Sequence, residues 1–376
     1  MRIGVMLRCL EEHGGIAVYA QNLVEELLRL DRTNHYVLFH RRAANVGRFG
    51  RHANVTERVV SGSNKVYWDQ VAIPWRCWRE QTDVVFHPKF TVPLLAPCKA
   101  VMVVHGADWF MPDQARYYSW ANVRCMRAVM PLYFRKSSVV LSVSQLTTDN
   151  FNHVLQLPED KVETVYFGPA RHFRRVTDEA ILEKTRRRYS LPPKFILTLT
   201  KRGGSDRKNL GQVFKGYARY HAMAADPYPL VIGGKDCHLF RAEYGVPATG
   251  YGEAIHFPGW LDQQDLPAIY SLAGLYLYPS NLEAFPIPVT EAMACGAPIV
   301  TSDANGLREI AGDACLLTDP SDADAIAQAI GRVLADSALA STLSAKGLER
   351  SRQFTWEACA KKTLAILESL DNGSRA

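Results

Sequence analysis

Short apolar runs alternate with amphipathic stretches of helical period along nearly the whole chain. In the first half the apolar runs predict strands at 2–7, 36–39, 84–86, 100–104 and 139–142, and the amphipathic stretches predict helices at 16–30, 66–78, 122–135 and 145–154. In the second half strands are predicted at 195–200, 230–232, 255–257, 275–278, 298–301 and 315–317, with helices between them. This alternation is typical of parallel βαβ units, so the predicted fold class is α/β.

A charged, turn-rich segment at 171–193 separates the two series of elements, and a new apolar strand begins at Phe195. The chain length of 376 residues exceeds the roughly 100–200 residues of one ordinary domain, and 47% of the residues are hydrophobic, enough for two cores. We therefore expect one domain at 1–175, a second at 190–354, and a C-terminal helix within 355–376 with Thr355 as its N-cap.

The charge balance is mildly basic, with 44 Lys and Arg against 38 Asp and Glu, a net charge of +6. This excess suits phosphate-bearing ligands or an anionic membrane surface. The sequence has no basic run of five or more residues and no aromatic-basic stripe, so no nucleic-acid partner is expected. The eight cysteines form no CxxC pair, and neither a secretory signal nor an apolar run of membrane-spanning length is found. We expect a cytoplasmic protein, with peripheral contact at the inner face of the membrane left open.

The segment from Tyr278 to Gly296 holds two glutamates eight residues apart. Glu283 follows a predicted strand, and Glu291 lies in the first turn of a helix that starts near Pro288. Both can face the carboxyl edge of a parallel sheet, where ligands bind in α/β folds. Carboxylates accept hydrogen bonds from paired sugar hydroxyls, which suggests Glu291 for a ribose and Glu283 for a hexose. The alternative is a first-turn acid that favours the helix dipole and a solvated loop acid.

Further candidates for anion binding lie at the ends of strands and the starts of helices. A basic loop after the strand at 195–200 carries Arg202 and Lys208, which could hold a diphosphate, although an exposed basic loop without a ligand is the alternative. The same diphosphate could meet backbone amides near Phe285, Ile287 and Gly15.

Two other positions are candidates on their place in the chain. His105 ends a predicted strand, where it could donate to a sugar hydroxyl, although a histidine there is more often structural. Gly259 and Trp260 follow another strand and are candidates to contact a base.

Several other chemistries lack their motifs. Asp322 and Asp324 have the spacing of a metal-binding DxD, but they open a predicted helix, where acids cap the N-terminus. HExxH, GxSxG and P-loop motifs are missing from the sequence. A nicotinamide-dependent dehydrogenase is disfavoured because the first strand-to-helix turn lacks the three-glycine fingerprint.

Taken together, these motifs resemble glycosyltransferase family 4, which has the GT-B architecture. The R-x5-K spacing of Arg202 and Lys208, the E-x7-E spacing of Glu283 and Glu291, and the continuation 292–300 carry the resemblance, which spans nearly the full chain. It implies two Rossmann-like domains with a cleft between them, the acceptor bound by the first domain, the donor by the second, and a terminal helix that crosses back to the first.

The resemblance also implies an activity: retaining transfer of a mannose- or glucose-type hexose from a GDP- or UDP-sugar to a glycan or lipid-linked glycan. No metal or other cofactor is expected. By this likeness Arg202 and Lys208 hold the diphosphate, Glu291 the ribose and Glu283 the hexose, while His105 contacts the sugar near the reacting centre. A GT-B epimerase or phosphorylase and a non-catalytic sugar-binding protein are the alternatives.

This chain departs from the family pattern at two places. Pro286 replaces a residue whose backbone N–H could have met the donor, and Gly106 follows the histidine where the family commonly has aspartate, with Asp108 two residues further on.

Overall fold

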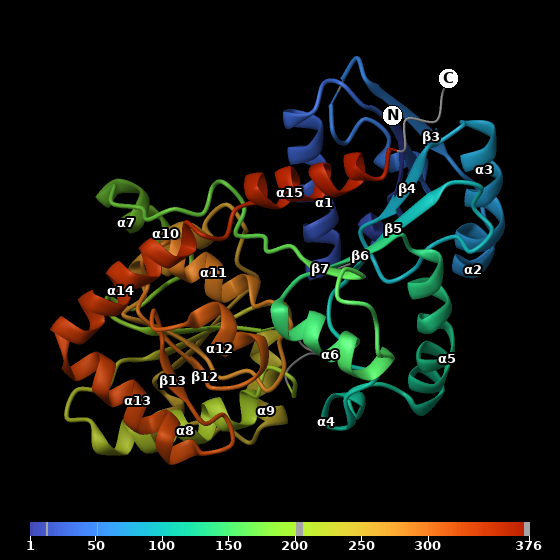
Figure 1. Ribbon diagram of the computed structural model, residues 1–376. Coiled ribbons are helices and arrows are strands. Elements are labelled where there is room, and N and C mark those ends of the chain that lie inside the picture. Colours follow the sequence, from blue (N-terminus) through green and yellow to red (C-terminus); the bar gives the residue numbers. More distant parts are fainter. Residues whose placement is uncertain (13, 51, 201–205, 372–376) are drawn as a thin grey trace. The chain divides into compact units, whose positions relative to one another are not determined.

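The protein was analysed as a computed structural model, and the structure describes residues 1–12, 14–50, 52–200 and 206–371. The chain divides into two compact units (Figure 1). The first comprises Met1–Phe167 together with Trp356–Ala376, and the second comprises Gly168–Thr355. Each unit is built on its own parallel β-sheet, which confirms the predicted α/β class.

The described part of the first unit contains a seven-stranded sheet with the order β3-β2-β1-β4-β5-β6-β7. All of its neighbouring strands pair in parallel. The strands are β1 (Arg2–Met6), β2 (His35–His40), β3 (Val55–Val59), β4 (Val84–His87), β5 (Lys99–Val104), β6 (Val139–Ser142) and β7 (Val162–Thr164). The helices are α1 (Gly15–Leu30), α2 (Lys65–Tyr67), α3 (Ile73–Arg79), α4 (Pro112–Ala115), α5 (Trp120–Lys136), α6 (Gln145–Leu155) and α15 (Trp356–Ser369), with a π-helical turn, η3 (Trp68–Ala72), between α2 and α3.

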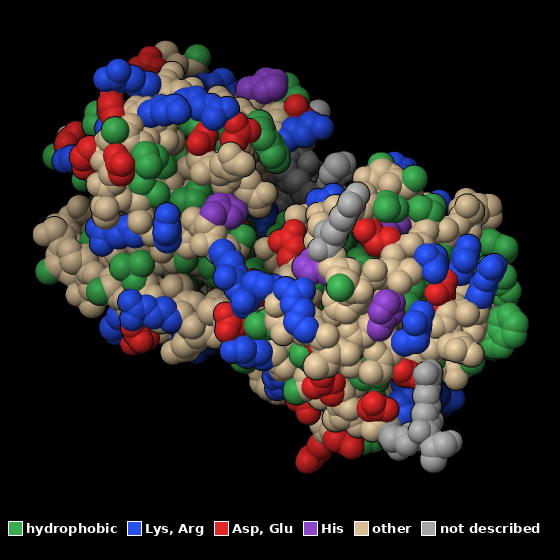
Figure 2. Space-filling view, turned by 90° about the horizontal axis from the view of Figure 1, so that it is seen from above, with side chains coloured by type: hydrophobic (Ala, Val, Ile, Leu, Met, Phe, Trp, Pro, Cys, Tyr) green, Lys and Arg blue, Asp and Glu red, His purple; other side chains and the backbone are tan. Residues whose placement is uncertain are grey.

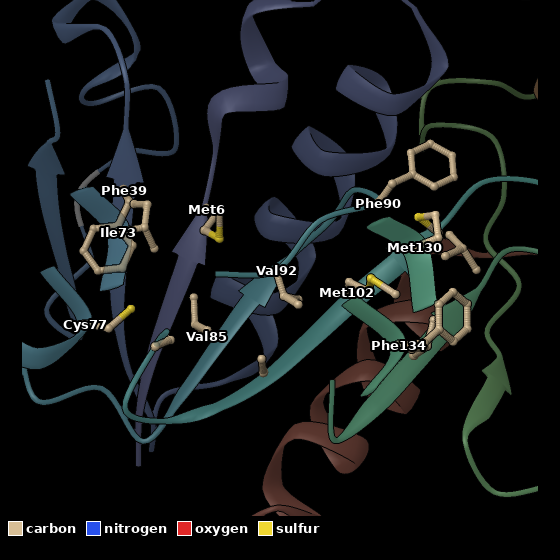
Figure 3. Close-up of a cluster of buried hydrophobic side chains, with 14 of the residues drawn as sticks. Met6, Phe39, Ile73, Cys77, Val85, Phe90, Val92, Met102, Met130 and Phe134 are labelled. Atoms are coloured by element: carbon tan, nitrogen blue, oxygen red, sulfur yellow. The ribbon is translucent and has the colours of Figure 1, made fainter. Parts of the chain in front are cut away.

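Helices cover the two faces of this sheet with separate apolar cores. One face packs against η3, α3, α5 and α6, and in Figure 3 Ile73 and Cys77 of α3 point toward the sheet near Phe39, while Phe134 of α5 lies near Met102. On α1 and α15 the Tyr19 and Trp356 rings meet edge to face with centroids 5.5 Å apart. The terminal helix therefore packs on the first unit.

The second unit repeats the same plan with six strands in its described residues, in the order β10-β9-β8-β11-β12-β13. The strands are β8 (Ile196–Leu199), β9 (Leu230–Gly233), β10 (Ile255–Gly259), β11 (Leu275–Tyr278), β12 (Ile299–Ser302) and β13 (Leu316–Thr318). The helices are α7 (Glu179–Arg188), α8 (Leu210–Met223), α9 (Phe240–Glu243), α10 (Leu266–Leu272), α11 (Ile287–Ala294), α12 (Asn305–Ala311), α13 (Ala323–Ala335) and α14 (Ser337–Ser351). The chain reverses its direction of travel across this sheet between β8 and β11, where doubly wound folds bind ligands.

The strand predictions are confirmed in the second unit, where all six strands were expected, and incomplete in the first. The two strands missed there, β3 and β7, are the edges of their sheet. The sequences of β3 and β7, Val-Thr-Glu-Arg-Val and Val-Glu-Thr, are interrupted by charged and polar residues, so they lack the apolar run by which even the edge strands β10 and β13 of the second sheet could be predicted. The helix expected at 66–78 is interrupted by the π-helical turn.

Candidate functional site

The carboxyl ends of β8 and β11 bring Lys208 and Glu283 into contact at the point where the chain order reverses. The Lys208 ammonium pairs with Glu283 Oε1 and donates to the Tyr278 hydroxyl, and it lies 4.6 Å from the centroid of the Tyr278 ring. Tyr278 Oη and Ser280 Oγ donate to the same carboxylate oxygen at 2.8 and 3.0 Å. Glu283 is only 6% exposed, which excludes the alternative of a solvated loop acid.

Backbone contacts hold the two loops of this cluster together. The Asn281 N–H donates to the Arg207 carbonyl at 2.9 Å, and Ser280 Oγ lies 3.0 Å from both this carbonyl oxygen and Glu283 Oε1, so the two acceptors share its single hydrogen. Asn209 Nδ2 donates to the Pro279 carbonyl at 3.0 Å, and buried amide donors of this kind are costly to leave unpaired. The loop that carries Lys208 and the loop that carries Glu283 are therefore joined along their length.

The start of α12 fixes the Glu283 loop from its other side. The Gly306 N–H donates to the Glu283 carbonyl at 2.9 Å. A Cβ atom at position 306 would lie 2.4 Å from the Ala284 carbonyl oxygen, so only glycine fits this approach. The backbone of the loop is thus held independently of the Glu283 side chain.

Glu291 is buried on α11 in a contrasting environment. It is 7% exposed, and its Oε2 accepts one hydrogen bond, at 3.3 Å, from the hydroxyl of buried Tyr270. Burial raises the pKa of Glu291 to about 8, with the Tyr270 hydrogen bond acting in the opposite direction. Glu291 is the fifth residue of the helix, about one residue past the first turn in which it was expected, so the alternative of a dipole-stabilising first-turn acid is excluded.

The N-terminus of α11 offers fewer free amides than the sequence suggested. Pro286 and Pro288 have no N–H, and the Ile287 N–H donates to the Phe285 carbonyl at 3.1 Å. The Phe285 ring is buried and meets Phe354 edge to face at 5.9 Å. At the other end Gly296 adopts φ 73°, a left-handed conformation that favours glycine after a helix. In this conformation the Ile287 amide is used within the protein.

The candidate base contacts lie at the end of β10. Gly259 is the last residue of this strand, and its carbonyl accepts from the Gly234 N–H at 2.9 Å. Trp260 follows with 65% of its surface exposed. An indole this exposed is available for stacking against a planar base.

His105 follows β5 in the first unit and is held by the backbone. Its Nε2 lies 3.1 Å from the Pro88 carbonyl oxygen, which can only accept, so Nε2 carries the proton. Burial lowers the pKa of His105 to about 4, so the ring is neutral at ordinary pH. In this conformation Nδ1 is a hydrogen-bond acceptor, so the expectation that this histidine donates to a sugar hydroxyl is corrected to acceptance.

The remaining predicted residues are placed as follows. Gly15 is the first residue of α1, after Gly14, which caps the helix with φ 141°. Arg202 lies outside the described residues. Asp108 accepts a hydrogen bond of 2.7 Å from the Tyr118 hydroxyl. Asp322 caps α13 by accepting from the Asp324 N–H at 2.8 Å, which confirms capping for this acid pair.

Lys208, Glu283 and Glu291 therefore all lie in the second unit, the one that was expected to bind the donor. Burial raises the pKa of Tyr276 of β11, and the negative charges of Glu291 and Glu283 act in the same direction. In the described part of the chain, no group of three or more His, Cys, Asp or Glu side chains is arranged to hold a metal ion.

Sequence reasoning missed the hydroxyl groups that position the carboxylates. Tyr278 and Ser280 belong to the segment that carries Glu283, and Tyr270 belongs to the helix before it. Only Tyr278 lies in a strand, as the last residue of β11, whereas Ser280 follows in the loop and Tyr270 lies on α10, so no single sequence period could have placed all three hydroxyls.

A family model described as "Glycosyl transferases group 1" matches residues 183–350, the range that contains Lys208, Glu283 and Glu291. Residues 183–350 thus resemble the group 1 glycosyltransferases. The predicted resemblance to family 4 is consistent with this group, and the prediction of an enzyme is confirmed.

Two Escherichia coli proteins illustrate the relatives of this glycosyltransferase. O-antigen chain mannosyltransferase B is 28% identical over 294 residues, which cover 76% of this chain and 74% of that protein. Serotype-specific mannosyltransferase WbdA is 28% identical over 268 residues, which cover 69% of this chain but 32% of WbdA.

Solved structures share the fold of the glycosyltransferase. Sucrose-phosphate synthase from Thermosynechococcus elongatus superposes with a TM-score of 0.79 at 21% identity and covers 100% of both chains. HepE of Anabaena, solved in complex with UDP and glucose, gives a TM-score of 0.74 at 16% identity over 98% of this chain and 100% of HepE. These likenesses confirm the predicted GT-B fold class.

Proposed function

We propose that this glycosyltransferase moves a mannose- or glucose-type hexose from a GDP- or UDP-sugar to a glycan or lipid-linked glycan, with retention of anomeric configuration and without a metal ion. The names of the E. coli relatives support mannose and a polysaccharide product. The UDP bound to HepE supports a nucleotide diphosphate donor. None of the relatives reported above is named as an epimerase or a phosphorylase.

The contact between Lys208 and Glu283 is the observation that carries this proposal. An ammonium with three donors can keep its carboxylate partner and still donate to a phosphate oxygen, which would stabilise the charge that develops on a leaving diphosphate. Among the described residues none donates to Glu283 Oε2, so this oxygen is available for a hexose hydroxyl. In the proposal Arg202 assists Lys208, Glu291 accepts from the ribose hydroxyls, and no protein nucleophile is assigned.

The remaining parts of the proposal concern the donor's surroundings and the place of action. Trp260 and Gly259 contact the base, the amides of Gly15 and Phe285 approach the diphosphate, and His105 accepts from the transferred sugar. The Ile287 amide is left out of this set because it already donates to the Phe285 carbonyl. No helix of the described chain is long and apolar enough to cross a bilayer. We place the enzyme in the cytoplasm, in peripheral contact with the inner face of the membrane, where a lipid-linked acceptor is held.

Thermal denaturation with a panel of nucleotides tests the proposal directly. A ligand that binds only the native state raises the melting temperature with its occupancy. We expect GDP or UDP, and at least one of their mannose or glucose derivatives, to stabilise the protein in the presence of EDTA. Stabilisation by none of them would contradict the donor assignment, and stabilisation that needs a divalent cation would contradict metal independence. NMR of the product anomeric proton then tests retention.

A further inference from the structure

One helical surface of the first unit exposes apolar side chains on the face that points away from the core. Along the segment that runs through α2, η3 and α3, Tyr67, Val71, Trp75 and Trp78 are 46%, 51%, 48% and 67% exposed. Their spacing of four, four and three residues places them on one side of a helix. Trp68, Ile73 and Cys77 fill the opposite side of the same segment and are fully buried (Figure 3).

The helical segment that carries these exposed side chains is held to the rest of the unit by hydrogen bonds. Trp68 Nε1 donates to the Val60 carbonyl at 2.8 Å, and Gln70 Nε2 donates to the Val92 carbonyl at 3.0 Å. Isolated exposed apolar residues are normal on soluble proteins, but a continuous row that includes two tryptophans marks a surface that contacts something else.

The surface continues through Leu95 to α5. The Leu94 N–H donates to Gln70 Oε1 at 2.9 Å, and Lys136 of α5 donates to the Ala96 carbonyl at 2.7 Å, so this loop lies between the two helices. Leu95 at its tip is 81% exposed. We call the surface made by α2–α3, this loop and α5 the tryptophan–arginine face.

The charges of the helical segments on this face are predominantly basic. Residues 65–79 contain three basic residues and residues 120–136 contain four, which makes seven, and Asp69 is the only acidic residue within these two ranges. Lys65 pairs with Glu12 at 3.8 Å, and Glu80, which follows α3, pairs with Arg2 and Arg58. Asp69 is buried and paired with Arg8 at 2.8 Å. The Arg76 and Arg79 guanidinium carbons lie 4.9 and 5.4 Å from the Trp75 ring centroid. Figure 2 shows hydrophobic side chains beside Lys and Arg at the right edge, on the side where Figure 1 draws α3.

We propose that the tryptophan–arginine face docks on a bilayer that contains anionic phospholipids. Tryptophan favours the boundary between headgroups and acyl chains, and arginine pairs with lipid phosphates there. Basic residues near an anionic leaflet add attraction that salt screens. The inference names the surface for the membrane contact proposed above and rests on that proposal only for its setting, since lipid binding is measured without donor or acceptor.

A second copy of the chain fits this face less well. A two-fold contact would place the seven cations of one copy against those of the other, and like charges across an interface oppose association. The cores of protein interfaces are also depleted in charged residues, whereas here arginines lie beside the tryptophans.

Flotation of the full-length protein with vesicles tests the docking face. We expect binding to vesicles of phosphatidylcholine with phosphatidylglycerol, weak binding to phosphatidylcholine alone, and release as salt rises. Trp75→Ser/Trp78→Ser and Arg76→Gln/Arg79→Gln should each lower the partition coefficient about tenfold or more. The matched controls are Met223→Ser, an exposed apolar side chain of α8 in the other unit, and Arg352→Gln, an exposed arginine after α14; both should bind as the wild type does.

The outcomes separate the docking surface from the proposed enzyme function. Thermal stabilisation by GDP or UDP should be the same in wild type and in the face variants, which also shows that the variants are folded. Wild-type vesicle binding by both double variants would overturn the docking proposal and leave the transferase proposal standing. A concentration-dependent dimer in sedimentation that the tryptophan variant abolishes, without vesicle binding, would assign the face to a second copy instead.

Discussion

Glu283 and Glu291 lie eight residues apart, yet the protein holds them in opposite ways. Glu283 sits in a loop among an ammonium and two hydroxyl donors that all reach one oxygen. Glu291 sits on a helix with a single long hydrogen bond from Tyr270, and its burial raises its pKa to about 8. The first carboxylate is positioned and its charge is balanced before any ligand arrives, whereas the second is buried without a cation beside it among the described residues.

This difference indicates that the two glutamates have different roles, which residue type and spacing alone could not predict. A preorganised charge pair is suited to a group whose charge changes during reaction, because it needs no rearrangement at that moment. A desolvated carboxyl gains most from a ligand that brings its own hydroxyl donors. Breaking each site separately should therefore change different kinetic quantities.

The largest effect is expected for Glu283→Gln. The substitution keeps the shape but removes the charge that faces Lys208, so turnover at saturating donor should fall by about 100-fold or more, with a smaller change in nucleotide affinity. Steady-state kinetics and calorimetric titration with the nucleotide diphosphate check this. A variant that loses affinity and keeps kcat would reverse the proposed roles of the two glutamates.

Next in size is the effect of Glu291→Ala on nucleotide binding. Removing the acceptor proposed for the ribose hydroxyls should weaken binding of the nucleotide diphosphate by about 10- to 100-fold. Calorimetric titration measures it, with Glu349→Ala on an exposed part of α14 as the control. Equal affinities in wild type and Glu291→Ala would refute the ribose assignment.

The stability of Glu291→Gln should depend on pH differently from that of the wild type. Because the folded-state pKa of Glu291 is raised above its ordinary value of 4.5, its contribution is fully present below that pH and is lost as pH rises toward about 8. The wild type should lose about 1.4 kcal/mol relative to the variant for each pH unit in this window. Urea unfolding from pH 5 to 8 measures the difference in unfolding free energy between the two proteins. A difference that stays constant with pH would contradict the raised pKa.

The smallest effect is expected for Tyr278→Phe. It removes one donor to Glu283 and keeps the ring beside the Lys208 ammonium, so kcat should fall about 3- to 10-fold while the donor KM changes little. Ser280→Ala removes the other hydroxyl donor and should act similarly. A large rise in KM with unchanged kcat would show that Tyr278 contacts donor directly and does not position Glu283.

The strands could be predicted where they contain an apolar run and were missed where charged or polar residues interrupt it. Interior strands such as β8 and β11 are continuous apolar runs, which the period of the sequence reveals. The edge strands β3 and β7 have no such run. At the site, spacing identified Glu283 and Glu291, but the hydrogen bonds that distinguish them come from Tyr270 and Ser280, whose positions depend on how separate elements meet in space.

The direction of the His105 hydrogen bond was beyond prediction for the same reason. Its place at the end of β5 follows from the apolar run before it, but the carbonyl that takes its proton belongs to Pro88, seventeen residues earlier in the chain. Contacts of this kind depend on backbone geometry that no local pattern encodes.

The hydrogen bonds between the Lys208 loop and the Glu283 loop constrain how this enzyme can be redesigned. Backbone and amide bonds from Arg207 and Asn209 reach three consecutive residues, Pro279, Ser280 and Asn281. If only one of these loops were replaced by the loop of another transferase, hydrogen-bond donors and acceptors between the two loops would lose their partners. The Lys208 ammonium and the Glu283 carboxylate would then shift. Exchanging donor preference by grafting should therefore succeed only when both segments are transferred as one cassette.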